Sequence, residues 1–88
     1  MRFLRFELPP KKSVKKYVAV LFNPQTNREV RVPFGDKRYE QYYDKIGQYS
    51  DLNHNDGNRR RLYRLRHAGE GNESNKYKAG WFAWHYLW

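Results

Sequence analysis

The chain has 88 residues, which is enough for one small domain and too few for two hydrophobic cores. Its 18 Lys and Arg outweigh 9 Asp and Glu, giving a formal net charge of +9 at pH 7, so we expect its partners to be polyanions. No cysteine is present, which excludes disulfides and thiolate chemistry, while the 18% of aromatic residues argues against disorder and predicts an aromatic-rich core.

Residues 1–16 are expected to form a basic N-terminal arm. Pro9 and Pro10 favour an extended backbone. Four lysines that repel one another follow these prolines: Lys11, Lys12, Lys15 and Lys16. Ahead of the prolines, the spacing of Phe3, Phe6 and Leu8 fits neither a strand nor a helix decisively, so residues 1–8 are left unassigned. The chain is therefore divided into this arm and a single small α+β domain over residues 17–88.

Residues 17–34 predict a β-hairpin. The run from Tyr17 to Phe22 is rich in β-branched and aromatic residues, and residues 23–27 have the composition of a turn. In the second strand, Val30, Val32 and Phe34 alternate with polar residues, as expected for an antiparallel sheet with one solvated face.

Two helices are predicted between residues 37 and 68. The first is amphipathic and ends at Gly47, because apolar side chains recur at spacings of three and four: Tyr39, Tyr42, Tyr43 and Ile46. The second begins after Asn55 or Asp56, which can cap it, and continues to about Ala68. Its spacing places Leu62 and Leu65 toward the core and the arginines toward solvent.

The C-terminal residues 77–88 contain six aromatic side chains, including every tryptophan, after a polar loop over residues 69–76. A helix from Ala79 places Trp81, Trp84 and Trp88 on one face, whereas a strand groups Trp84 and Trp88 with Phe82 and Tyr86. Periodicity does not decide between them, and propensity favours the helix. The expected fold class is α+β, with a β-hairpin or small antiparallel sheet packed against two or three short helices.

The strongest candidate site is cationic. Five guanidiniums fall within eight residues of the second helix, and the planar guanidinium suits bidentate contacts with phosphate. Only Asp56 and Glu70 bracket them, so local ion pairs cannot neutralise the charge. The predicted nucleic-acid-binding residues are Arg59, Arg60, Arg61, Arg64 and Arg66, together with Lys11, Lys12, Lys15 and Lys16.

The tryptophans allow three interpretations. They are expected first as core, since a small domain needs its large side chains inside. They could instead stack on single-stranded bases, or form an interface with another protein, in which case Trp81, Trp84 and Trp88 are the interface residues.

We predict no catalytic residue, no metal site and no cofactor. His54, Asp56 and His67 invite a nuclease hypothesis, but they lack ligand pairs at defined spacing, and an Asn- and Asp-rich segment before a helix is typical of capping. The longest apolar run, residues 18–22, is far shorter than the roughly 20 residues that span a bilayer, so no membrane span is expected.

Several blocks resemble a family of small basic proteins encoded by large DNA viruses of the phycodnavirus and mimivirus kind. The first covers residues 16–35, KYVAVLFNPQTNREVRVPFG, and the later ones cover residues 39–42, 54–56 and 59–67, Ala79-Gly80 and residues 86–88. The family's last block usually has Ser or Arg where this chain has Trp81 to His85. The resemblance implies a viral setting and supplies no catalytic residue.

The function expected from this sequence is that of a non-enzymatic, virion-associated protein that binds nucleic-acid backbone, DNA rather than RNA, without strong sequence preference. The alternative is a minor capsid or cement protein that binds acidic patches on neighbouring capsid subunits. Localisation is expected in the virion and in a reducing intracellular compartment of the infected host cell.

Overall fold

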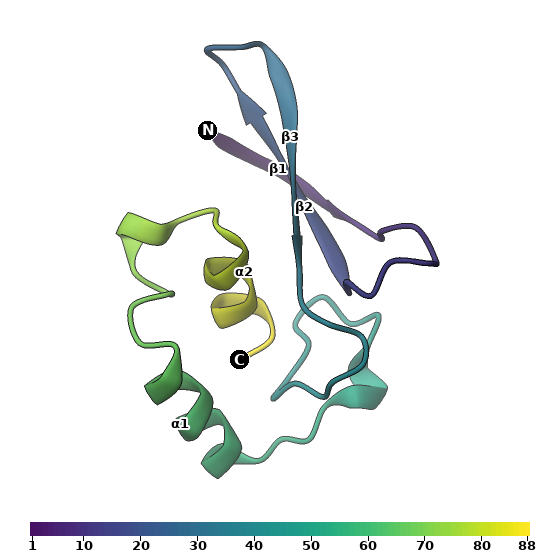
Figure 1. The fold of residues 1–88 in the computed structure, drawn as a ribbon, viewed down its shortest axis with the longest axis vertical. Helices are drawn as coiled ribbons and strands as arrows, with labels where there is room; N and C mark the ends of the chain where they lie inside the picture. Colours follow the sequence, from purple (N-terminus) through teal and green to yellow (C-terminus); the bar gives the residue numbers. More distant parts are fainter.

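The computed structural model describes residues 1–88 as a three-stranded antiparallel sheet with two helices (Figure 1). The strands are β1 (Arg2–Glu7), β2 (Tyr17–Asn23) and β3 (Arg28–Phe34), in the order β1-β2-β3. The helices are α1 (Gly57–Arg66) and α2 (Ala79–Tyr86), with short 3-10 turns at Ser50–Leu52 and Glu73–Asn75. The predicted α+β class is confirmed, and so is the helical choice for residues 79–86.

The predicted hairpin is β2 and β3. Tyr17 pairs with Phe34 at one end and Asn23 with Arg28 at the other. Asn27 closes the turn at a φ of 56°, a left-handed conformation that asparagine tolerates well. Residues 17–21 are buried along their whole length, because β2 is the central strand and both of its faces are covered.

Strand β1 corrects the predicted division at residue 16. Residues 2–7 pair antiparallel with β2, and Phe3 and Phe6 pack against the core, so this segment belongs to the sheet. The register shifts between Phe3 and Arg5. This β-bulge brings two aromatics three residues apart onto one face, which is why their spacing matched no regular strand.

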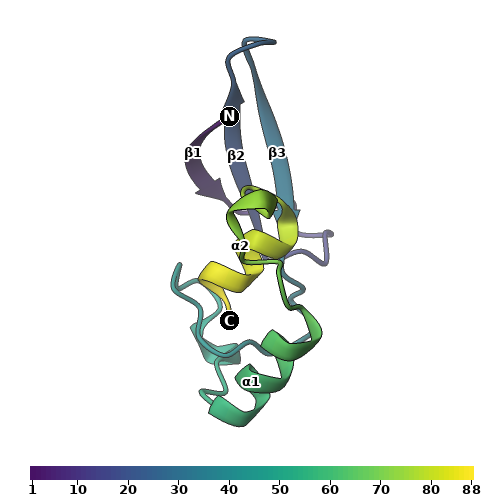
Figure 2. The same cartoon turned by 90° about the vertical axis from the view of Figure 1, so that its left-hand side faces the viewer.

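The core lies between one face of the sheet and α2, which lies in front of the lower end of that face in Figure 2. Phe82 of α2 stacks on Phe34 with ring centroids 5.3 Å apart, and Phe6 meets Tyr86 edge-on at 4.8 Å. Leu87 is buried just beyond the helix. The predicted aromatic-rich core is therefore present, and it is built mainly from phenylalanine and tyrosine.

The opposite face of the sheet is covered by ion pairs. Arg5 pairs with Glu7 at 2.7 Å and with Glu29 at 3.3 Å, and Arg31 also pairs with Glu7. Arg5 and Arg31 flank Val20 in the register, and their stems cover this fully buried valine. Arg2 lies on the same face, over the Phe22 ring, so three arginines meet two glutamates and most of the charge on this face is neutralised.

The amphipathic helix predicted over residues 37–47 is wrong, because the segment forms turns and bends. The buried carboxylate of Asp44 accepts hydrogen bonds from the backbone N–H groups of Ile46, Gly47 and Tyr49, at 2.8, 3.0 and 2.9 Å. Another backbone N–H group of this segment donates to a residue distant in sequence: Tyr43 N donates to Leu87 O at 3.0 Å. These bonds replace the i to i−4 ladder of a helix.

Residues 69–76, predicted as a polar loop, form successive turns held against α2. The Asn75 amide donates to Gly69 O at 2.8 Å, and the His85 imidazole lies 3.0 Å from Gly71 O. Gly71 packs on the indole of Trp84 so closely that a Cβ there would overlap the ring. Neither helix is long and apolar enough to cross a membrane.

Candidate nucleic-acid interface

Helix α1 carries the arginines, and Asp56 caps its start. The Asp56 carboxylate accepts from Asn58 N at 2.9 Å and from Arg59 N at 3.3 Å, so this part of the prediction is confirmed. The helix ends at Arg66, before the predicted Ala68. Figure 1 shows α1 beyond the end of the sheet, on the far side of α2.

The orientation predicted for α1 is wrong. Leu62 and Leu65 are 43% and 63% exposed, while Arg60, Tyr63 and Arg64 turn toward the rest of the protein. The cause is Trp88, which lies beside the helix. Its ring stacks on Tyr63 at 4.2 Å with an interplanar angle of 4°, and its main-chain oxygen accepts from Arg60 Nε at 2.8 Å and Arg64 Nη2 at 3.1 Å.

Cation–π contacts strengthen this inward arrangement. The Arg60 guanidinium lies 4.7 Å from the centroid of the Tyr42 ring, and that of Arg64 lies 4.7 Å from Trp84. Tyr63 is packed between His67 and Trp88, and burial together with the charge of Glu70 raises the pKa of Tyr63 to about 12. Arg60 and Arg64 are therefore structural as well as cationic.

A groove of about 350 Å³ runs along the exposed flank of these inward arginines. It is lined by Gly57, Arg60, Arg61, Arg64 and Leu65, and by no carboxylate. Burial, and then the charge of Arg60, lower the pKa of Arg64, and Arg64 Nε is buried without a hydrogen-bond partner. The groove thus concentrates three guanidiniums whose mutual repulsion no internal anion relieves.

The other two predicted arginines are exposed. Arg59 forms an ion pair with Glu40 at 2.9 Å, whereas Arg66 reaches only the main-chain oxygen of Leu62, at 3.4 Å from Nε. Arg61 makes neither an ion pair nor a side-chain hydrogen bond, so Arg61 and Arg66 are the α1 cations freest to meet an external anion.

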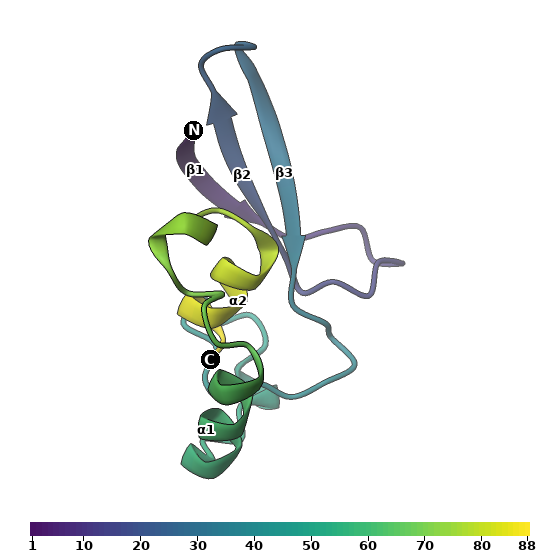
Figure 3. The same cartoon turned by 60° about the vertical axis from the view of Figure 1, so that its left-hand side comes forward.

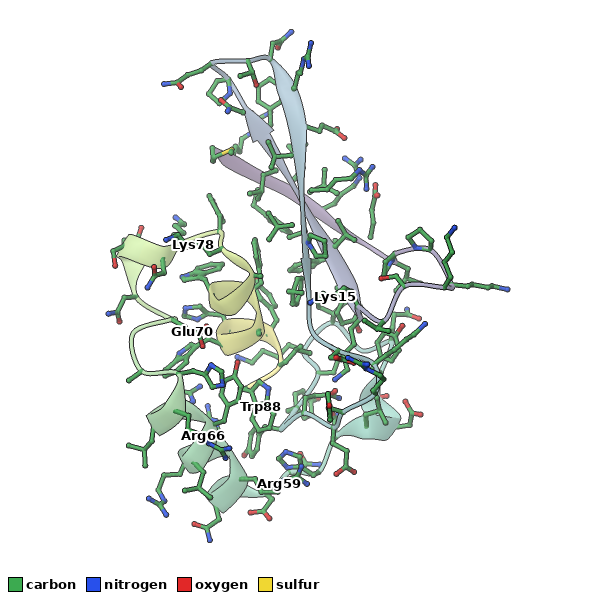
Figure 4. All side chains as sticks on the ribbon, in the orientation of Figure 1. Lys15, Arg59, Arg66, Glu70, Lys78 and Trp88 are labelled. Atoms are coloured by element: carbon green, nitrogen blue, oxygen red, sulfur yellow. The ribbon has the colours of Figure 1, made fainter.

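A second cationic surface, here called the lysine loop, comprises Lys11, Lys12, Lys15 and Lys37. The first three are exposed, as predicted. Lys37 joins them because its Nζ donates to Lys11 O at 2.7 Å and its backbone N–H donates to Val14 O at 2.8 Å. Sequence reasoning missed Lys37, since no spacing rule connects it to residues 11–15. In Figure 4, Lys15 lies near the lower end of the sheet, whereas Arg59 and Arg66 of α1 lie at the bottom of the molecule.

Lys16 does not belong to this surface, which corrects the prediction that it binds nucleic acid. Its side chain is almost completely buried, with 2% exposure. Its Nζ donates to Gln41 Oε1 and to Tyr39 O, the latter at 2.9 Å. Burial lowers the pKa of Lys16, and the charges of Asp44 and Asp36 oppose that shift. Lys16 therefore fixes the main chain around residues 39–41.

A cleft of about 330 Å³ lies between α2, α1 and the segment after β3. Figure 3 shows that segment leaving the sheet and returning beneath α2. Apolar walls come from Phe34, Ala83 and Leu87, and polar atoms come from Lys15, Asp36, Tyr39 and Glu40. A side-chain hydrogen bond from Arg38 lowers the pKa of Asp36 to about 2, so its carboxylate is ionised.

The tryptophans are half-buried and hold the C-terminal region together. Trp88 contacts Tyr63 on α1, Trp84 lies under the Arg64 guanidinium, and Trp81 packs edge-on against Phe82 at 5.2 Å. All three tryptophan rings pack against other side chains of the protein. This packing supports their interpretation as core residues over that as a stacking platform for bases or as an exposed protein interface.

The residues of the nuclease hypothesis do not converge. His54 Nδ1 accepts the Asp56 N–H at 2.9 Å, Asp56 caps α1, and His67 Nδ1 pairs with Glu70 at 2.5 Å. Burial, and next the charge of Arg59, lower the pKa of His54. No group of three or more His, Cys, Asp or Glu side chains is placed to hold a metal ion.

Comparison of the chain with protein-family models, curated proteins and solved structures found no match. The resemblance to viral proteins therefore stays a prediction from sequence blocks.

Proposed function

We propose that the protein is a non-enzymatic binder of nucleic-acid backbone, with DNA as the expected partner. The observation that carries this proposal is the groove on α1, where Arg60, Arg61 and Arg64 gather without a carboxylate. Guanidiniums present several N–H donors each, and Arg60 and Arg64 use only part of theirs on Trp88. A phosphate in the groove would accept the remaining donors and offset the repulsion between the guanidiniums.

The distribution of ion pairs supports the same conclusion. Acidic residues pair with Arg5 and Arg31 on the solvated face of the sheet, so most of the excess positive charge lies elsewhere. It is concentrated in two places, on α1 and on the lysine loop. Contacts of this kind position a protein on phosphates and carry no base information, which fits binding without strong sequence preference.

The proposed setting is a virion, and it rests on the sequence resemblance. A basic protein of this kind would neutralise packaged DNA, since each phosphate contact by Lys or Arg releases bound counterions. Nothing in this role requires chemistry on the nucleic acid.

The proposal is tested by a salt titration of binding to a labelled duplex of about 30 base pairs, between about 50 and 200 mM salt. The double variant Arg61→Ala, Arg66→Ala removes two exposed cations that do not support the fold. Its log–log slope should be shallower than that of the wild type by about 1.8, at about 0.9 per phosphate contact. Lys11→Ala, Lys12→Ala should have a similar effect.

A matched control removes two cations from the far end of the sheet. Arg2 and Arg28 are exposed and lie near the hairpin turn, where no groove of arginines is formed. Arg2→Ala, Arg28→Ala should leave the slope nearly unchanged. Binding that does not weaken with salt, or an equal loss in the control, would refute backbone binding through α1 and the lysine loop.

A second candidate, a minor capsid or cement protein, is favoured by the outward face of α1. Leu62 and Leu65 are exposed there side by side, flanked by Arg61 and Arg66. Apolar contact ringed by guanidiniums suits an acidic protein surface, because charge complementarity orients the partner and leucine burial contributes affinity.

This candidate makes its own prediction. Leu62→Ser, at the leucine that does not line the groove, should abolish association with purified capsid shell protein while duplex binding through the groove persists. Retained association in that variant would exclude the leucine face as the contact.

A further inference from the structure

We propose that the cleft between α2, α1 and the segment after β3 binds a single unpaired nucleobase that carries an exocyclic amino group. This inference rests on the function proposed above and names the form of nucleic acid that the protein prefers. The cleft volume of about 330 Å³ lies at the lower end of the roughly 300–1,000 Å³ typical of small-ligand pockets.

The walls of the cleft suit a flat, largely apolar ring. Phe34, Ala83 and Leu87 line it, together with Gly35 and Gly80. A Cβ on Gly35 would come within 3.0 Å of Leu87 Cδ1, so a larger residue there would displace a wall of the cleft.

Tyr39 supplies a stacking surface at the edge of the cleft. Its side chain is 65% exposed, although it lines the cleft. The Arg38 guanidinium lies over the ring at 5.8 Å from the centroid. The main chain beneath it is held by Lys16, whose Nζ donates to Tyr39 O at 2.9 Å. An exposed aromatic ring on an anchored main chain can stack a base as the aromatic side chains of single-strand binders do.

Glu40 supplies the hydrogen-bond acceptor. Arg59 donates to Glu40 Oε1 at 2.9 Å, and Oε2 of the same carboxylate accepts no hydrogen bond. Carboxylates in nucleic-acid interfaces accept from the exocyclic amino group of cytosine. Adenine and guanine also carry amino groups, whereas an unpaired thymine has only its N3–H, flanked by two carbonyl oxygens that repel a carboxylate, so thymine is the base that this acceptor disfavours.

Lys15 connects the cleft to the lysine loop. It lines the cleft and is exposed, so its ammonium can meet the phosphate attached to a base held against Tyr39. Lys11 and Lys12 of the same loop are exposed and add further positive charge, and Lys37 is bonded to Lys11. A single strand could therefore lay its backbone on the lysine loop with one base in the cleft, whereas a duplex keeps its bases paired.

The test measures binding of labelled single strands of about 12 bases, all dC or all dT, beside a duplex, at about pH 7.5. The wild type should bind dC more tightly than dT. Tyr39→Ala should weaken dC binding by about 5- to 150-fold, the loss expected for one base stack, and should change duplex affinity less than about twofold. Tyr39→Trp should keep the dC affinity, and Glu40→Gln should remove the preference for dC over dT.

Tyr43→Ala is the matched control, because Tyr43 is 51% exposed and does not line the cleft. If Tyr39→Ala affects single strands no more than Tyr43→Ala, while duplex binding remains salt-dependent, the nucleobase site is refuted and backbone binding stands. If neither strand nor duplex binds with salt dependence, the proposed function fails and this inference fails with it.

Discussion

Asp44 is the residue on which the segment facing the cleft depends most. Its Oδ1 accepts from the N–H groups of Ile46 and Gly47, and its Oδ2 accepts from Tyr49 N at 2.9 Å and from Tyr17 OH at 2.5 Å. Asp44→Asn replaces one of these oxygens with an NH2 group, so two of the four donors lose their acceptor whichever way the amide is placed.

The expected cost follows from those two donors. A buried donor left without its acceptor costs about 1–3 kcal/mol, so the variant should lose about 2–6 kcal/mol of unfolding free energy. A domain of this length has a total of about 4–13 kcal/mol, at about 0.05–0.15 kcal/mol per residue. The substitution should therefore remove a large part of the stability, although the shape of the side chain hardly changes.

Urea denaturation followed by tryptophan fluorescence measures this loss, because the tryptophans lie in the C-terminal region that contacts the Asp44 segment. Asp51→Asn is the control, since Asp51 is exposed and forms no ion pair. A loss below about 1 kcal/mol in Asp44→Asn, or an equal loss in Asp51→Asn, would show that the carboxylate does not organise this segment.

Two further predictions concern His54 and the glycines. Since burial lowers the pKa of His54 in the folded state, the unfolded chain takes up the proton first, and stability should fall as the pH drops from about 7 through the unfolded value of about 6.5. His54→Gln should flatten this dependence in melting curves, and identical pH profiles would contradict the assignment. Gly71→Ala should cost about 1–3 kcal/mol because the added Cβ overlaps Trp84. Gly57→Ala, which meets nothing within 4 Å at the start of α1, should instead stabilise by about 0.4–1 kcal/mol in the same urea titration, and equal effects of the two would refute the packing argument.

Sequence patterns correctly predicted the elements that are determined by residues close together in the sequence. The β2–β3 hairpin follows from strand propensity and a turn sequence, and α1 follows from a capping aspartate. The regular spacing of Tyr39, Tyr42, Tyr43 and Ile46 predicted a helix wrongly, because spacing gives no sign of a carboxylate that competes for backbone N–H groups. Strand β1 was missed for a related reason, since its bulge breaks the alternation that identifies a strand.

The orientation of α1 could not be predicted from the spacing of its apolar residues. Hydrophobic spacing alone places Leu62 and Leu65 inward. The structure exposes them because Arg60 and Arg64 find a main-chain oxygen and two aromatic rings on the facing segments. Those partners lie far away in sequence, so composition could identify the cationic helix but could not say which of its cations stay free.

The C-terminal turn links the arginine groove to the cleft. Trp88 orients the arginines of the groove, Leu87 packs near Gly35 at the cleft, and the carbonyls of Tyr86 and Leu87 accept from Lys45 N and Tyr43 N at 3.0 Å each. The aromatic block at residues 81–88 is thus the element that joins α1 and the 39–54 segment to the sheet. Its richness in aromatics follows from this task, because a small domain with few aliphatic side chains needs large rings to hold three separate segments together.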